Sequence, residues 1–134
     1  MKKLNCILLI DDNELDNFYH ERVLRKSNST ENVVTKESAT AALDFLKAKD
    51  NHLDLHPDLI FLDINMPGMN GWEFLEEYDK LNPDLKGKII IVMLTTSTNP
   101  EDEMRAHNIK SLSGYLTKPL MEEKIKDIIE QYFS

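Results

Sequence analysis

The stretch Leu59-Ile60-Phe61-Leu62-Asp63 decides how this chain folds. Four consecutive apolar residues end in an aspartate, and the loop that follows contains Pro67 and Gly68. A run that is apolar at every position predicts a strand buried on both faces, because a strand with one solvated face alternates apolar and polar residues. Such strands occur in parallel sheets covered by helices, so we expect strands and helices to alternate along the chain.

The rest of the sequence repeats this alternation. Strands are predicted at residues 5–10, 33–35, 59–62, 88–94 and 113–117, and helices at residues 14–25, 40–49, 72–81, 100–107 and 121–133. In the first helix Leu15, Phe18 and Tyr19 recur at helical spacing, and Ser38 is the expected N-cap of the second. We therefore predict an α/β fold of the flavodoxin-like (βα)5 type, a three-layer sandwich. Alternation does not fix the strand order, and the expected order of the parallel five-stranded sheet is 2-1-3-4-5.

Length, charge and cysteine content exclude several classes of function. The chain has 134 residues, the usual size of one domain, so we expect residues 1–134 to form a single domain without an attached effector domain. The formal net charge of −8 repels nucleic-acid phosphates, so direct nucleic-acid binding is not expected. Cys6 is the only cysteine, and no apolar run is long enough for a signal peptide or a membrane span. These features predict a cytoplasmic protein that does not insert into membranes.

Chemically active side chains follow four of the predicted strands. In chain order these are Asp11 and Asp12, then Asp63, then Thr95 and Thr96, then Lys118. Because the carboxyl ends of parallel strands lie at one edge of a sheet, we expect these side chains to line one shallow pocket. Three carboxylates packed together repel, and a hard divalent cation such as Mg²⁺ relieves that repulsion.

A carboxylate beside Mg²⁺ can attack phosphorus and form an aspartyl phosphate. Lys118 would pair with another phosphoryl oxygen, and the hydroxyl of Thr95 would donate a hydrogen bond to a third. Each motif alone has a simpler interpretation, since Asp11-Asp12 could cap a helix and Lys118-Pro119 could form an exposed turn. Their joint occurrence at strand ends favours phosphoryl transfer.

The combined motifs resemble the response-regulator receiver family. They are Asp11-Asp12, the segment Phe61-Leu62-Asp63-Ile64-Asn65-Met66-Pro67-Gly68-Met69-Asn70-Gly71, Thr95, and the segment Gly114-Tyr115-Leu116-Thr117-Lys118-Pro119. The match covers nearly the whole chain in family order. It implies that Asp63 is the phosphoacceptor and that Asp12 binds the metal directly, while Asp11 acts mainly through water. It also implies that the backbone carbonyl of Asn65 binds the metal, which is expected to be Mg²⁺ with Mn²⁺ as the alternative.

The resemblance further implies a conformational switch. Thr95 matches the switch hydroxyl, with Thr96 as the alternative in this run of hydroxyl residues, and Tyr115 matches the switch aromatic residue. Lys118 matches the phosphate-binding lysine, and its bond to Pro119 is expected to be cis. Phosphorylation would then move Tyr115 inward and reshape the face made by the fourth helix, the fifth strand and the fifth helix.

The implied function is that of a phosphoacceptor in a two-component phosphorelay. A histidine kinase or a phosphotransfer protein would supply the phosphoryl group, with residues 13–25 as the expected contact surface. The downstream partner would be a protein that the sequence does not identify. The chain would not be an enzyme, apart from catalysing its own phosphorylation and dephosphorylation.

Three other functions fit the sequence less well. A non-phosphorylated interaction module with the same fold is disfavoured because every residue that the chemistry needs is present. A flavodoxin-like electron carrier needs a loop rich in Ser, Thr and Gly after the first strand, where this chain has Asp11-Asp12-Asn13. A haloacid-dehalogenase-like phosphatase needs an acidic residue two positions after its nucleophile, where this chain has Asn65.

Overall fold

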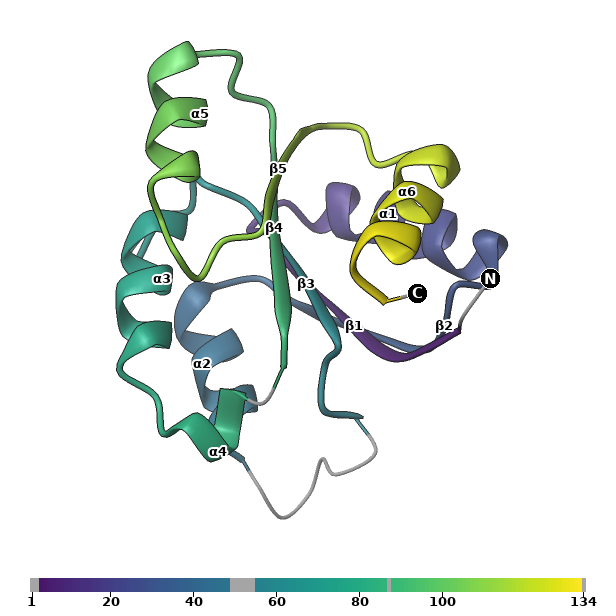
Figure 1. Ribbon diagram of the computed structural model, residues 1–134, viewed down its shortest axis with the longest axis horizontal. Coiled ribbons are helices and arrows are strands. Elements are labelled where there is room, and N and C mark those ends of the chain that lie inside the picture. The colour runs from purple at the N-terminus through teal and green to yellow at the C-terminus, as the bar shows by residue number, and fades with distance from the viewer. Residues whose placement is uncertain (1–2, 49–54, 87, 134) are drawn as a thin grey trace.

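The computed structural model describes residues 3–48, 55–86 and 88–133. Its elements, in chain order, are β1 (Leu4–Ile10), α1 (Glu14–Ser27), β2 (Thr30–Lys36), α2 (Ala39–Lys47), β3 (Leu59–Leu62), α3 (Gly71–Asp79), α4 (Pro83–Lys86), β4 (Ile90–Thr95), α5 (Pro100–His107), β5 (Gly114–Thr117) and α6 (Glu122–Phe133). Figure 1 shows the strands in the centre with helices on both sides.

All strand pairs in the sheet are parallel, and the order is β2-β1-β3-β4-β5. The predicted fold class and strand order are therefore confirmed. The continuous apolar runs of β1 and β3 are buried on both faces because helices cover the sheet from each side.

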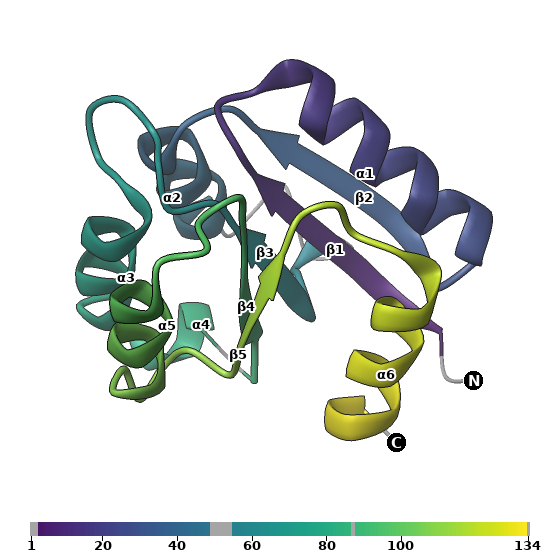
Figure 2. The ribbon, with the colours of Figure 1, turned by 90° about the horizontal axis from the view of Figure 1, so that it is seen from above.

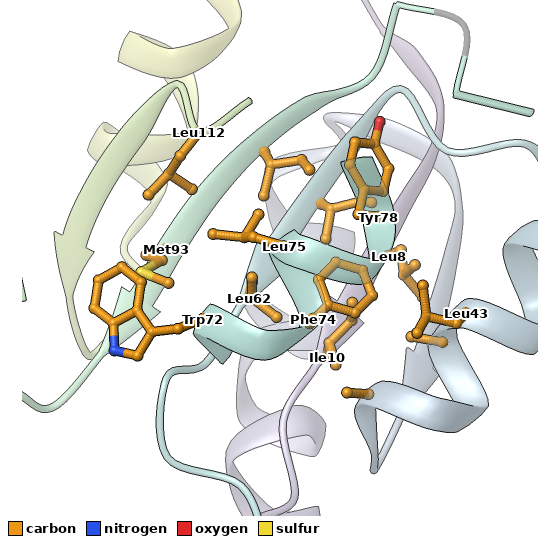
Figure 3. Close-up of a cluster of buried hydrophobic side chains, with 14 of the residues drawn as sticks. Leu8, Ile10, Leu43, Leu62, Trp72, Phe74, Leu75, Tyr78, Met93 and Leu112 are labelled. Atoms are coloured by element: carbon orange, nitrogen blue, oxygen red, sulfur yellow. The ribbon is translucent and has the colours of Figure 1, made fainter. Parts of the chain in front are cut away.

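Alternate strand residues divide the core into two layers. Leu8, Ile60 and Met93 point toward α2, α3 and α5, whereas Leu9 and Phe61 point toward α1 and α6. Figure 2 shows the same separation of the helices from a second direction. In the first layer, the aromatic and aliphatic side chains of α3 pack over the strands. Figure 3 labels the α3 residues Trp72, Phe74, Leu75 and Tyr78 and the strand residues beneath them, Leu8, Ile10, Leu62 and Met93.

Several element boundaries differ from the sequence prediction. The short helix α4 (Pro83–Lys86) was not predicted, because four residues are too few to show a helical period. With this helix present, the fourth and fifth helices of the predicted pattern are α5 and α6. Strand β2 is longer than the predicted 33–35, because its first residues are polar and carry no apolar signal. Residue 49, the predicted end of the second helix, lies outside the described residues.

Helix α1 buries polar side chains and exposes apolar ones. Asn17 and His20 are 5% and 3% exposed, whereas Leu15, Phe18 and Tyr19 are 77%, 61% and 44% exposed. The helical spacing predicted the helix, but these three apolar residues do not pack into the core. The reason is that the first turns of α1 lie against the polar carboxyl edge of the sheet, where Asn17 donates a hydrogen bond to the backbone carbonyl of residue 11.

Across residues 3–48, 55–86 and 88–133, no helix combines the length and the apolar character that crossing a membrane would require.

Candidate functional site

Strands β1 and β3 end side by side, and this brings the predicted acidic residues together. Ile10 pairs with Leu62 in the sheet, and the backbone N–H of Asp63 donates to the carbonyl of Ile10 at 3.0 Å. Asp11 and Asp63 therefore leave the sheet from adjacent positions. One carboxylate oxygen from each of Asp11, Asp12 and Asp63 lies within 4.8 Å of the others.

The backbone next to Asp63 is held by a close approach that only glycine permits. The N–H of Gly71 donates to the carbonyl of Ile64 at 2.8 Å. A Cβ atom on Gly71 would lie 2.5 Å from the carbonyl oxygen of Asp63. Asn70 caps α3, and its side chain and that of Glu73 bond reciprocally to each other's backbone N–H. The loop that contains Asn65 is thus fixed at both ends, and Asn65 itself is exposed.

Lys118 lies among the carboxylates. Its Nζ atom is 2.6 Å from Asp11 Oδ2 and 3.7 Å from Asp63 Oδ1. Its backbone N–H donates to the carbonyl of Thr95 at 2.8 Å, which ties the end of β5 to the end of β4. The bond between Lys118 and Pro119 is cis, as expected. The structure thus brings four of the predicted site residues together: Asp11, Asp12, Asp63 and Lys118.

The surroundings of Asp63 disfavour the ionised form of its carboxyl group. Burial, and after it the nearby charge of Asp11, raise its pKa from the ordinary value of 3.8 to about 6, a net shift that already includes the opposing effect of Lys118. For Lys118, burial alone would lower the pKa, but hydrogen bonds to Asp11 and Asp16 outweigh burial and raise it. Lys118 is therefore protonated at neutral pH, yet one ammonium group does not neutralise the carboxylates around it.

This donor set fits a hard divalent cation. Mg²⁺ and Mn²⁺ prefer oxygen ligands, and Mg²⁺ usually keeps several waters. The three clustered carboxylates supply oxygen ligands, and Asp12 and Asn65 are exposed, so water can reach that side of the cluster. A bound cation would also offset the repulsion by Asp11, which adds to burial in raising the pKa of Asp63.

The two threonines at the end of β4 occupy different environments. Thr95 is fully buried and Thr96 is exposed. Met93 packs in the core layer under α3 and α5 and Leu94 packs in the opposite layer, so alternation places Thr95 on the α5 side. Tyr115 packs against that same layer.

Thr95 and Tyr115 are joined through the backbone of Ser97. The N–H of Ser97 donates to Thr95 Oγ1 at 3.1 Å, and the hydroxyl of Tyr115 donates to the carbonyl of Ser97 at 3.3 Å. The hydroxyl of Ser97 in turn donates to Asp102 of α5 at 2.6 Å. Of the two threonines, Thr95 is thus the one that is linked to Tyr115 and to α5.

The sequence prediction missed three residues of α1 that face the site. Asp16 lies 2.8 Å from Lys118 Nζ, and Asn17 donates to the carbonyl of Asp11 at 2.8 Å. His20 is buried, and burial, together with the charge of Lys118, lowers its pKa, while Asp16 and Asp11 oppose the shift. The position of α1 in the sequence could have indicated these residues. The helix begins directly after β1, so its first turns must lie at the carboxyl edge of the sheet.

Comparisons with known proteins agree on one family. The family model described as the response regulator receiver domain matches residues 7–130. Response regulator Rcp1 from Synechocystis sp. is 34% identical over 125 residues, which cover 92% of this chain and 81% of that protein.

Two solved structures show the same likeness over almost the full chain. The crystal structure of a two component response regulator from Cytophaga hutchinsonii has a TM-score of 0.86 at 28% identity and covers 98% of each chain. The crystal structure of the Mn²⁺-bound form of response regulator Rcp1 has a TM-score of 0.75 at 30% identity, covering 97% of this chain and 96% of that one.

Proposed function

The chain belongs to the response regulator receiver domain family, and from this we propose that it is a phosphoacceptor of a two-component phosphorelay that is phosphorylated on Asp63. One observation carries the proposal. Asp63 is a buried carboxylate beside Asp11 and Asp12, and Lys118 lies 3.7 Å from it. An acidic cluster of this kind, with the ammonium group of Lys118 facing it, suits the transfer of a phosphoryl group to a carboxylate.

The proposed donor is the phosphohistidine of a histidine kinase or a phosphotransfer protein. A carboxylate oxygen of Asp63 attacks the phosphorus atom, the P–N bond breaks, and the electron pair stays on the imidazole nitrogen, which takes up a proton. Lys118 then pairs with an oxygen of the aspartyl phosphate. Beyond this transfer and the hydrolysis of its own aspartyl phosphate, the chain is not an enzyme in this proposal.

The proposed cofactor is Mg²⁺, with Mn²⁺ as an alternative. Asp12, Asp63 and the backbone carbonyl of Asn65 would hold the ion directly, and Asp11 would act through water. When bound, the ion offsets the charge that builds on the transferring group. The Mn²⁺-bound form of the related Rcp1 supports this choice of ion class.

The proposed output is a change on the face formed by α5, β5 and α6. Thr95, drawn toward the phosphoryl group, would release the N–H of Ser97 and so disturb the contact between Ser97 and Tyr115. A groove lined by Ser97, Tyr115 and Lys124 lies on this face. We propose that a downstream protein reads the groove; the proposal includes no contact with nucleic acid or membrane and places the chain in the cytoplasm.

The proposed contact surface for the donor is the exposed side of α1. Leu15 and Phe18 are largely exposed there, and a groove runs between Phe18, Arg22 and Lys26. Since α1 begins at the carboxyl edge of the sheet, a helix that docks on this side can bring its phosphohistidine to Asp63. The charges of Arg22 and Lys26 favour an acidic docking surface on the donor.

Incubation with acetyl phosphate and Mg²⁺, followed by intact-mass measurement, tests the proposal. The wild type should gain one phosphoryl group, and EDTA should prevent the gain. Asp63→Asn should gain none. Asp79→Asn, which changes an exposed aspartate at the end of α3, is the matched control and should behave like the wild type. A wild type that stays unmodified would support a non-phosphorylated interaction module instead.

A further inference from the structure

Lys118 is bound by a carboxylate outside the cluster at the strand ends. Its Nζ atom lies 2.8 Å from Asp16 Oδ2 of helix α1, but 3.7 Å from Asp63 Oδ1. Lys118, which is expected to bind the phosphoryl group, is therefore held nearer to Asp16 than to the phosphoacceptor Asp63. Neither the sequence motifs nor the proposed chemistry assigns a role to Asp16.

The position of Asp16 is fixed by the start of α1. Its backbone N–H donates to Oδ1 of the N-cap residue Asn13 at 3.1 Å. The N–H of Asn13 donates to Asp11 Oδ1 at 2.9 Å, and the side chain of Asn17 donates to the carbonyl of Asp11 at 2.8 Å. This first helical turn is thus tied to the end of β1, so the backbone of Asp16 is fixed and its carboxylate can follow Lys118 only as far as rotation of its short side chain allows.

Asp11 and Asp16 hold Lys118 in different ways. Asp11 belongs to the acidic cluster, so a shift of the lysine toward Asp63 can keep Asp11 as a partner. Asp16 reaches the lysine from the helix, and its side chain is 36% exposed, compared with 7% for Asp11. When Lys118 moves to bind a phosphoryl oxygen at Asp63, it therefore loses its contact with Asp16 before its contact with Asp11.

We propose that Asp16 is a positioning residue that competes with the phosphoryl group for Lys118 and so restrains the phosphorylated state. This inference rests on the proposed function, since it needs Asp63 to be the acceptor. Removing the charge of Asp16 should release Lys118 and strengthen the binding of a phosphoryl group. The expected gain in affinity is about fivefold, which corresponds to the upper end of the free energies measured for partly exposed ion pairs.

Beryllofluoride, an analogue of the phosphoryl group, provides the test. Its affinity would be measured by calorimetry at saturating Mg²⁺ for the wild type, Asp16→Asn and Glu14→Gln. Glu14 lies in the same first turn, is exposed and forms no ion pair among the described residues. Its variant thus controls for the loss of one negative charge near the site, and should stay within about twofold of the wild type.

A structural readout distinguishes positioning from a general effect. In crystals of metal-free Asp16→Asn, Lys118 Nζ should move within hydrogen-bond distance of Asp63, and Asp16→Glu should restore an affinity near that of the wild type. An Asp16→Asn variant that binds no more tightly than Glu14→Gln, or that leaves Lys118 in place, would overturn the inference. If the wild type itself binds no beryllofluoride, the proposed function fails instead, so the two failures can be told apart.

Discussion

Replacement of Asp63 by asparagine should make the metal-free protein more stable at neutral pH. Burial, with the charge of Asp11, raises the pKa of Asp63 from 3.8 to about 6, and this net shift already includes the opposing effect of Lys118. A folded-state pKa above the unfolded value means that the native state holds its proton longer. The contribution of Asp63 to stability therefore falls as the pH rises from about 4 to about 6. A shift of about two pKa units corresponds to about 3 kcal/mol, and Asp63→Asn should recover about 2 to 3 kcal/mol of this at pH 7.5.

Urea unfolding in EDTA, followed by circular dichroism at several pH values, measures this effect. At pH 7.5 the midpoint of Asp63→Asn should lie about 1 M higher than that of the wild type, given a typical slope of about 2 kcal/mol per M. Below about pH 3 the two curves should nearly coincide, because the carboxyl group is then neutral in both states. A stability difference that does not change with pH, or a variant less stable than the wild type at pH 7.5, would refute the electrostatic reasoning.

Three further predictions concern the surroundings of the site. Gly71→Ala would place Cβ 2.5 Å from the backbone oxygen of Asp63, so thermal unfolding should show a loss of about 1–3 kcal/mol, and an unchanged melting temperature would contradict the close approach. Thr95→Ala should bind beryllofluoride without NMR chemical-shift changes on the face formed by α5, β5 and α6. Thr96→Ala should show the same chemical-shift changes as the wild type. The reverse pattern would make Thr96 the switch residue. Phe18→Ser should slow transfer from a phosphohistidine donor but leave the rate of phosphorylation by acetyl phosphate unchanged. Because this side chain is 61% exposed, the free energy of unfolding should change by no more than about 0.5 kcal/mol. A normal transfer rate would exclude α1 as the donor surface.

The fold was predictable because the strands carry a strong signal. The apolar runs at residues 6–10 and 59–62 have no polar position, and this pattern belongs to strands covered on both faces. Helix α4 (Pro83–Lys86) was missed since one turn of helix has no period to detect. The first residues of β2 were missed since an edge strand can carry polar side chains such as Asn32.

The candidate site was predictable to the extent that it lies at strand ends. Asp11, Asp63 and Lys118 follow parallel strands, so the topology places them at one edge of the sheet, where the structure brings their side chains into contact. Asp16 was missed because its position depends on which side of α1 faces the sheet, and the exposed apolar residues of that helix gave the wrong indication. From the sequence, Thr95 was preferred over Thr96 as the switch hydroxyl. The structure adds that Thr95 is buried and accepts a hydrogen bond from Ser97, whereas Thr96 is exposed. Which of the two acts as the switch stays a prediction.

Locating the phosphoryl group on the chain tests the central claim most directly. Wild-type protein would be phosphorylated with acetyl phosphate and Mg²⁺, the acyl phosphate reduced with borohydride, and the digested peptides sequenced by mass spectrometry. The account predicts one modified residue, Asp63. A modification on Asp11, Asp12 or any other residue, or none at all, would contradict it.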